Sequence, residues 1–144
     1  MTVILDDHLV RDWLARRDQS LVAAVDGEQL ATTNLWYARL CKSAARATGG
    51  AMLAGWRPDE RRGLIASLLA LPDDILVLPM RQLAWAMAEL AADHKGLSTL
   101  GAEAVAAALS LNARLIVSAR DDGPGIRECC RSLGVAYDAL ARPV

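Results

Sequence analysis

A short apolar run near the start of the chain decides how the fold is interpreted: Val3-Ile4-Leu5, followed directly by Asp6-Asp7. Three consecutive apolar residues, two of them β-branched, favour a buried strand. Residues 8–17 then carry apolar side chains at helical spacing, so the chain is predicted to open as a strand, an acidic turn and a helix. An acid at such a strand end either caps the helix or belongs to a functional site, and the sequence leaves both roles open for Asp6.

Apolar strands and helices alternate along the rest of the chain. Helices are predicted over residues 35–47, 58–71, 80–94, 98–111 and 124–133, with Gly49-Gly50 ending the first of them. Strands are predicted at residues 114–118 and 134–137, whereas residues 21–25 form a strand or a helix end and residues 75–78 a strand or a turn. This alternation predicts an α/β fold: a single domain over residues 1–144 with a doubly wound, mostly parallel sheet flanked by helices. Ligands of such sheets bind beyond the carboxyl ends of the strands.

The composition is that of an ordinary globular chain, because 53% of the 144 residues are hydrophobic and 23% are charged. The net charge of -1 gives no overall attraction to phosphate backbones, so binding of a nucleic acid would need a local basic patch. Three cysteines without C-x-x-C spacing, no signal peptide and no apolar run of bilayer length predict a cytoplasmic protein without a membrane partner.

Four segments, in their order along the chain, resemble the motifs of the PIN domain, the metal-dependent nuclease fold of many bacterial toxins from toxin–antitoxin pairs. Val3-Ile4-Leu5-Asp6 resembles its opening hydrophobic-Asp motif, and residues 30–40 resemble the strand-to-helix segment that normally ends in Ala-Glu-Leu. Residues 97–109 resemble the Asp-Ala-x-x-Ala-Ala helix, and residues 113–122 the strand that ends in Thr-x-Asp-x-Asp. The resemblance covers nearly the whole chain and implies a PIN-like fold.

The resemblance also implies a set of acidic site residues, because a PIN nuclease holds Mg²⁺ or Mn²⁺ with three or four clustered carboxylates. Carried over by position, Asp6 matches the first acid and Glu103 the third, whereas Arg39 stands in place of the second. The fourth position holds an arginine followed by two acids, Arg120, Asp121 and Asp122.

Two arginines in place of acids weaken the expected metal site. We expect Arg39 to replace the cation, to lie within salt-bridge distance of Asp6 or Glu103, and to lower the pKa values of these carboxyl groups. The predicted function is then that of a degenerate PIN-like domain, a non-cleaving or weakly active relative of toxin ribonucleases. Such a domain needs no cofactor and binds a protein partner or RNA. Its vestigial site residues would be Asp6, Arg39, Glu103 and Asp121.

An active enzyme is the first alternative. It would be a Mg²⁺- or Mn²⁺-dependent endoribonuclease that holds its metal with Asp6, Glu103 and either Asp121 or Asp122. The sequence does not show which of these two neighbouring aspartates faces the site.

A receiver-like regulatory domain is the second alternative. Residues 4–11 resemble the strand-one acidic pair of those phosphoacceptor domains, and residues 116–122 and 142–144 resemble their later motifs. A receiver also needs an aspartate at the end of its third strand, and residues 50–55 contain none. Asp73 and Asp74 precede an apolar run instead of following one.

The remaining chemically active side chains are expected to be structural. Without a Cys or His cluster, His8 and His94 are expected at the surface or as cap partners, and Ser98 is expected to cap a helix. The tryptophans are expected in the core or in an interface, namely Trp13, Trp36, Trp56 and Trp85. The helices over 58–71 and 80–94 carry much apolar surface, so a homodimer is predicted with Met80 and Trp85 among its contacts.

Overall fold

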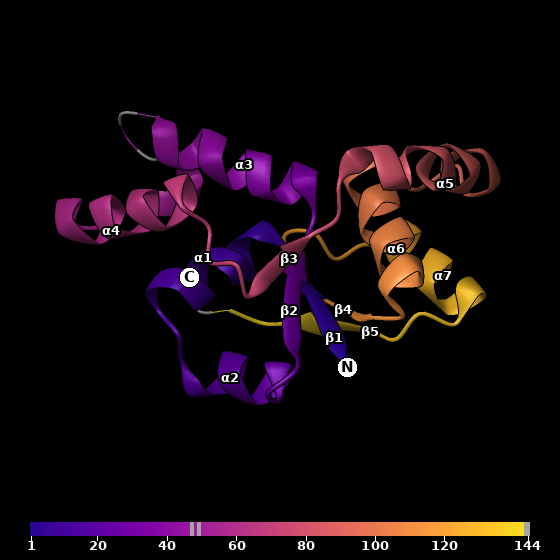
Figure 1. The fold of residues 1–144 in the computed structure, drawn as a ribbon, viewed down its shortest axis with the longest axis horizontal. Coiled ribbons are helices and arrows are strands. Elements are labelled where there is room, and N and C mark those ends of the chain that lie inside the picture. Colours follow the sequence, from indigo (N-terminus) through magenta and orange to yellow (C-terminus); the bar gives the residue numbers. More distant parts are fainter. Residues whose placement is uncertain (47, 49, 143–144) are drawn as a thin grey trace.

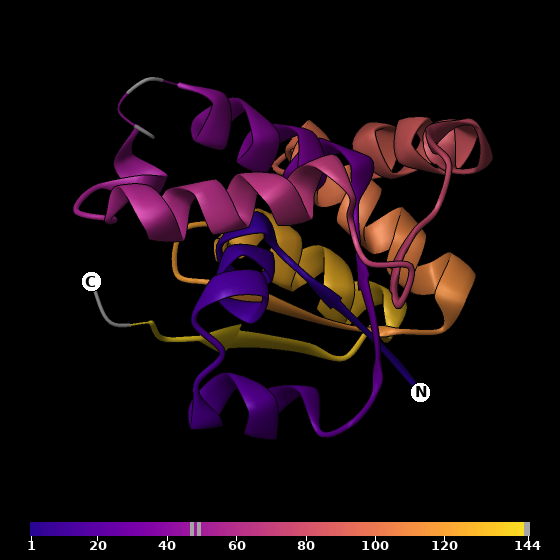
Figure 2. The same ribbon diagram turned by 60° about the vertical axis from the view of Figure 1, so that its left-hand side comes forward.

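The computed structural model describes residues 1–46, 48 and 50–142, and it shows one parallel sheet between two layers of helices (Figures 1 and 2). The strands are β1 (Thr2–Leu5), β2 (Gln29–Thr32), β3 (Ile75–Val77), β4 (Arg114–Ser118) and β5 (Tyr137–Leu140). They lie in the order β3-β2-β1-β4-β5, and every neighbouring pair is parallel. The predicted α/β fold with a doubly wound parallel sheet is confirmed.

Seven α-helices and one short 3-10 helix lie within the residues that the structure describes. They are α1 (Asp7–Ala15), α2 (Gln19–Val25), α3 (Asn34–Ala45), η1 (Ala51–Leu53), α4 (Pro58–Leu69), α5 (Met80–Asp93), α6 (Thr99–Leu111) and α7 (Pro124–Leu133). None of these helices combines the length and the apolar character needed to cross a membrane.

The central strand is buried on both faces because its side chains alternate between two cores. Val3 and Leu5 pack into the core that α1, α2 and α4 cover, whereas Ile4 packs into the core that α5, α6 and α7 cover. Helix α3 contributes to both cores, with Trp36 on one side and Leu40 on the other. Figure 1 shows these two groups of helices on opposite sides of the sheet.

Four segments differ from the sequence-based expectations or resolve them. Residues 75–78, left open between a strand and a turn, form strand β3 over Ile75–Val77. Residues 21–25 belong to helix α2, which Asp18 caps by accepting a hydrogen bond from the backbone N of Leu21 at 2.9 Å. The last strand begins three residues later than predicted, because Gly134, at φ 70°, ends α7 and starts a turn. The helix predicted over 35–47 ends at Ala45, and its expected end at 47 and Gly49 lies outside the described residues.

The parallel pairing brings the carboxyl ends of β1, β2 and β4 together, and we call this side of the sheet its carboxyl edge. Asp6 follows β1, Thr33 follows β2, and Ser118 is the last residue of β4. All three are buried polar residues. The carboxyl edge of the sheet is therefore where a polar site can form.

Candidate functional site

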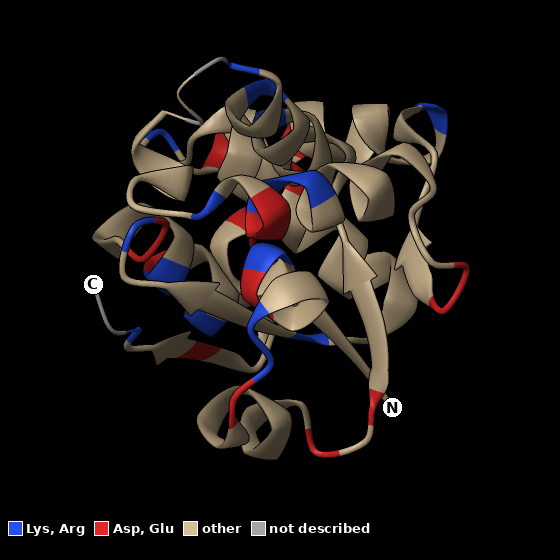
Figure 3. Ribbon diagram, turned by 90° about the vertical axis from the view of Figure 1, so that its left-hand side faces the viewer, with Lys and Arg blue, Asp and Glu red and all other residues tan. Residues whose placement is uncertain are grey.

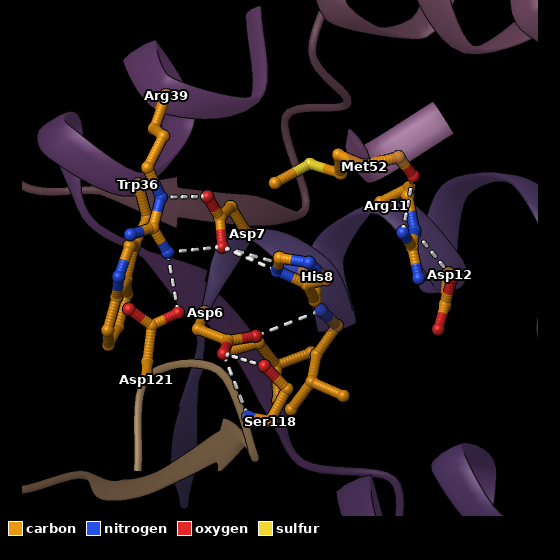
Figure 4. Close-up of polar contacts among 12 residues, drawn as sticks. Asp6, Asp7, His8, Arg11, Asp12, Trp36, Arg39, Met52, Ser118 and Asp121 are labelled. Carbon is orange, nitrogen blue, oxygen red and sulfur yellow. Dashed lines mark hydrogen bonds and ion pairs between the residues drawn. The ribbon is translucent and has the colours of Figure 1, made fainter. Parts of the chain in front are cut away.

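Asp6 serves both as a helix cap and as the centre of this edge (Figure 4). One carboxylate oxygen accepts a hydrogen bond from the backbone N of Leu9 at 3.0 Å and so caps α1. The other oxygen accepts hydrogen bonds from the backbone N and the hydroxyl of Ser118, at 2.8 and 2.6 Å. The carboxylate thus joins the ends of β1 and β4 while it starts the first helix.

Burial dominates the protonation of Asp6, because the side chain is completely enclosed. Loss of solvation raises its pKa to about 7; the hydrogen bonds from Ser118 and Leu9 oppose this rise, and the nearby Asp121 carboxylate adds to it. The expectation that an arginine lowers the pKa of Asp6 is therefore wrong. Asp6 is a carboxyl group that ionises close to neutral pH.

Arg39 reaches this edge from α3, but it pairs with two other acids (Figure 4). Its Nε and Nη2 atoms donate to the two oxygens of Asp7, the latter at 2.8 Å. Nη2 also donates to Asp121 at 2.6 Å. The expected contact with Asp6 or Glu103 is therefore wrong, because Asp7, in the first turn of α1, and Asp121, in the loop after β4, take up the guanidinium.

This pairing controls the charge of the acids around Arg39. Burial by itself would raise the pKa of Asp7, but the hydrogen bonds and positive charges of Arg39 and His8 bring it below its usual value. The hydrogen bonds to Asp7 in turn raise the pKa of Arg39. Both groups are therefore charged at neutral pH, and the guanidinium is a permanent cation among carboxylates.

Glu103 lies on α6, is fully buried, and is used to hold the start of α3. One carboxylate oxygen accepts hydrogen bonds from the backbone N and the side-chain amide of Asn34, both at 2.8 Å. The other accepts from the backbone N of Leu35 at 2.8 Å. A carboxylate at a helix N-terminus is favourable for the free N–H groups and for the helix dipole. Glu103 therefore anchors α3 onto α6 and does not touch Arg39.

The two aspartates after β4 differ in their partners. Asp121 faces the edge and pairs with Arg39, whereas Asp122 accepts a hydrogen bond from the Tyr137 hydroxyl at 2.7 Å and pairs with Arg127. Arg120 is exposed, and the ion pairs of these two aspartates are with Arg39 and Arg127 instead. Of this pair, the structure thus brings Asp121 toward Asp6 and turns Asp122 to β5.

Within the described part of the chain, one group of side chains has the spacing to hold a metal ion. It consists of Asp6, Asp7, His8 and Asp121, whose ligand atoms all lie within 4.8 Å of one another. Neither Asp7 nor His8 was expected in the PIN-like site; Asp7 had a role only in the acidic pair of the receiver-like alternative. His8 is half-buried, and its Nδ1 lies 3.2 Å from a carboxylate oxygen of Asp7. The sequence signal that could have found them is that Asp7 and His8 directly follow Asp6. When Asp6 caps α1, the next residues lie in the first turn of the helix, close to the end of β1.

The donor types would suit a hard cation, but all of their carboxylate oxygens except one oxygen of Asp121 already accept a hydrogen bond. Arg39 occupies both oxygens of Asp7 and one oxygen of Asp121. Asp6 accepts three hydrogen bonds, from Leu9 and from Ser118. A divalent metal at this position would meet the positive charge of Arg39, which cannot be lost.

The receiver-like hypothesis does not agree with the arrangement of the sheet. Asp73 and Asp74 lie just before β3, at its amino end, whereas Asp6 follows the carboxyl end of β1. Because the strands are parallel, Asp73 and Asp74 lie at the amino ends of the strands and Asp6 lies at their carboxyl ends, on the opposite side of the sheet. In this sheet β3 is an outer strand, whereas the 2-1-3-4-5 strand order of that fold places the third strand in the middle. The last residues of the tail motif, 143 and 144, lie outside the described residues.

No protein-family model and no curated protein matches the chain. Among solved structures, the fold is similar to a chain of FitAB bound to an IR36 DNA fragment, with a TM-score of 0.60 and 14% identity over 95% of this chain and 94% of that one. It is also similar to a chain of FitAcB from Neisseria gonorrhoeae, with a TM-score of 0.50 and 17% identity over 94% of this chain and 96% of that one. The α/β fold of the chain therefore matches that of a PIN-like neighbour.

Proposed function

We propose that this chain is a toxin-type PIN-like domain with a degenerate site, which binds a protein partner or RNA and cleaves weakly or not at all. The observation that supports this is the Arg39 guanidinium, which lies among the carboxylates where a nuclease would hold its metal. The vestigial site is then Asp6, Arg39 and Asp121, joined by Asp7. Glu103 acts on this site indirectly, because it holds the start of α3, the helix that carries Arg39.

Arg39 supplies a positive charge at the position where a metal cation would otherwise lie. Two opposite unit charges about 4 Å apart attract by about 4 kcal/mol at an effective dielectric constant of about 20. The Arg39 pairs are closer than this, and the Asp7 carboxylate is completely buried. A metal ion would have to displace the guanidinium and lose this attraction. We therefore expect weak Mg²⁺ or Mn²⁺ binding and no required cofactor.

The alternative is an active Mg²⁺- or Mn²⁺-dependent endoribonuclease, and the four clustered ligand groups favour it. In that case the metal would be held by Asp6, Asp7, His8 and Asp121, after Arg39 has moved away. The set implied by the sequence resemblance, with Glu103 and Asp122, is less suitable because both carboxylates are bonded elsewhere.

The proposed protein partner is supported by the two similar structures. FitAB and FitAcB are toxin–antitoxin complexes, and FitAB is bound to a DNA fragment. By analogy of fold alone, this chain would bind an antitoxin-like protein. A binding role needs no catalysis and is therefore compatible with a neutralised acidic site.

Calorimetric titration with Mn²⁺ tests the proposal directly. We expect the wild-type protein to bind Mn²⁺ only weakly, and we expect Arg39→Glu to bind it at least about tenfold more tightly because a ligand replaces a competing cation. The matched control is Lys42→Glu, which makes the same charge change at an exposed position of α3. Submicromolar Mn²⁺ binding by the wild type, together with Mn²⁺-dependent cleavage of single-stranded RNA, would overturn the proposal in favour of the nuclease.

A further inference from the structure

A second concave region lies next to the acidic cluster, and four of its thirteen lining residues are arginines. This basic groove, of about 500 Å³, lies between α1, η1 and the loop after β4. The side chains that matter for its chemistry are His8, Arg11, Arg16, Trp56, Arg120 and Arg142. Figure 4 shows Arg11 on the far side of His8 from Arg39, so the groove and the cluster share His8 as their border. Its volume is within the range of about 300–1,000 Å³ for small-molecule sites.

The acids in the groove are already neutralised. Asp12 accepts from Arg11 at 2.8 Å and from Arg142 at 2.9 Å, and Asp18 accepts from Arg142 at 3.1 Å. Four arginines therefore face two aspartates, and Arg16 and Arg120 are the surplus. Figure 3 shows acidic and basic segments side by side in the middle of this side of the molecule, which agrees with a small net charge. The positive surplus is thus local to the groove.

Arg16 is held in an orientation that suits an oxyanion. Its guanidinium lies 4.0 Å from the centroid of the Trp56 ring, and Arg11 approaches the same ring at 5.7 Å. Glu60, outside the groove, pairs with Arg16 at 3.1 Å. A guanidinium stacked on an aromatic face keeps its N–H edge in plane and available for two oxygens. Glu60 occupies the Nε and Nη2 atoms of Arg16, at 3.2 and 3.1 Å. Arg16 is partly exposed, so its Nη1 side is the part that a ligand can reach.

Arg120 supplies the second cation in excess of the acids that line the groove. It is exposed, and no acid within the described part of the chain forms a salt bridge with it. It lines the groove together with Ser118 and Ala119, at the end of β4. Ser118 also donates to Asp6, so this end of the groove adjoins the acidic cluster. A ligand that contacts Arg120 and Arg16 would span the groove from the sheet edge to Trp56.

We propose that the basic groove binds the phosphate groups of a nucleotide, through the guanidiniums of Arg16 and Arg120 and without a metal. Phosphate matches the planar N–H pairs of arginine, and a groove of this size accommodates a nucleotide rather than only a single phosphate. The nucleotide is free or part of an RNA strand, since both present the same chemistry. The proposal rests on the proposed function only where that function includes RNA, for which it supplies the contact surface.

The test is a titration in excess EDTA, with fluorescein-labelled twelve-nucleotide oligo(U) RNA followed by anisotropy and with AMP and adenosine as competitors. We expect Arg120→Ala and Arg16→Ala each to weaken RNA binding at least about fivefold, and to lower the slope of log K against log salt by about 0.7 per lost phosphate contact. The control Arg81→Ala removes an exposed arginine from α5, away from the groove, and should change neither value. AMP should compete and adenosine should not. A gain in affinity of the RNA over AMP identifies a strand as the ligand, and equal affinity identifies a free nucleotide.

Binding that is unchanged in both groove variants, or absent for both RNA and AMP at millimolar concentration, would overturn the groove proposal. This outcome would not contradict the proposal of a degenerate site, because Mn²⁺ binding to Arg39→Glu tests that proposal in a separate experiment. Conversely, Mn²⁺-dependent cleavage by the wild type overturns the proposed function and leaves EDTA-resistant binding in the groove intact. Thermal melting of each variant shows whether it is folded. Arg120→Ala is the decisive variant, because Arg120 is exposed and forms no salt bridge within the described part of the chain.

Discussion

At the scale of single residues, one guanidinium balances several carboxylates. Arg39 donates hydrogen bonds to Asp7 and Asp121. Asp6 lies beside them, and burial raises its pKa to about 7. Asp7 is completely enclosed, so its negative charge depends on Arg39 and His8 for compensation. A buried charge that loses its partner costs far more than the pair contributes when it is intact.

Replacing Arg39 by alanine is therefore expected to destabilise the fold by about 2–3 kcal/mol, because Asp7 and Asp121 lose their shared cation. Urea unfolding at pH 7.5 measures this loss. Lys42→Ala, on the same helix and exposed, should change the free energy of unfolding by less than about 0.5 kcal/mol. Equal stability of the two variants would mean that Arg39 is a surface residue without a structural role.

The raised pKa of Asp6 predicts a pH dependence of stability. The value of about 7 in the fold lies above the usual 3.8, so the folded state binds this proton more tightly than the unfolded state. The resulting stability is fully present below about pH 4 and is lost as pH rises through about 7. Asp6→Asn has no such proton and should lack this component.

Free energies of unfolding from pH 4.5 to 8 test this expectation. Relative to Asp6→Asn, the wild type should lose stability with rising pH, by on the order of 3 kcal/mol over the range. Asp7, whose pKa is lowered, acts in a different window, since its contribution is lost only as pH falls below its usual value. Parallel pH profiles for the two proteins would show that Asp6 does not titrate in this range.

At the scale of elements, Glu103 connects α6 to the first turn of α3. Its carboxylate satisfies two backbone N–H groups at the start of α3, and Thr33 satisfies a third by accepting from Trp36 at 3.1 Å. Helix α3 also carries Arg39, so Glu103 supports the site by positioning that helix. This role differs from metal ligation, which the sequence resemblance implied for the same residue.

Replacing Glu103 by alanine separates the two roles. We expect a loss of about 3 kcal/mol in the free energy of unfolding, because buried donors of Asn34 and Leu35 lose their acceptor. Glu103→Gln should cost less, since its amide oxygen keeps one of these bonds. Glu103→Gln introduced into the Arg39→Glu variant should leave the Mn²⁺ affinity within about twofold of that of Arg39→Glu alone. A tenfold loss of that affinity would instead identify Glu103 as a metal ligand.

At the scale of the whole molecule, the predicted homodimer depends on apolar surface that the fold leaves uncovered. Trp85 on α5 is 79% exposed and Leu69 on α4 is 84% exposed, whereas Met80 is half-buried. Figure 1 shows α4 and α5 at opposite ends of the long axis, so the two helices do not form one continuous face. Trp85 is the larger of the exposed side chains and the better anchor for an interface.

We expect the wild type to have the mass of a dimer in light scattering at micromolar concentration, and we expect Trp85→Lys to be monomeric. Leu69→Lys is the control and should stay dimeric, because it lies at the other end of the molecule. A monomeric wild-type protein would contradict the dimer. In that case Trp85 would remain available for a different protein partner.

The sequence by itself determined most of the order of the elements and the place of the candidate site, at the carboxyl ends of the strands. Runs such as Val3-Ile4-Leu5 and Leu115-Ile116-Val117 are buried on both faces of a parallel sheet, so their pattern is visible without any tertiary contact. Asp6 and Ser98 are local caps, whose hydrogen bonds span three residues. Where local signals compete, as at residues 21–25 and 134–137, the sequence did not settle helix against strand or the strand's start.

Only the tertiary structure decided which side chains meet at the carboxyl edge. Arg39 lies 32 residues from Asp7 and 82 residues from Asp121 along the chain, and Glu103 lies 69 residues from Asn34. Such pairings depend on the direction in which each helix approaches the sheet and on which charged side chain is nearest once it packs. Periodicity does not encode this choice, because one residue along a helix turns a side chain by about 100°. The order of motifs thus predicted a PIN-like fold, whereas the packing of α1, α3 and α6 placed Arg39 between Asp7 and Asp121 and turned Glu103 to a helix end.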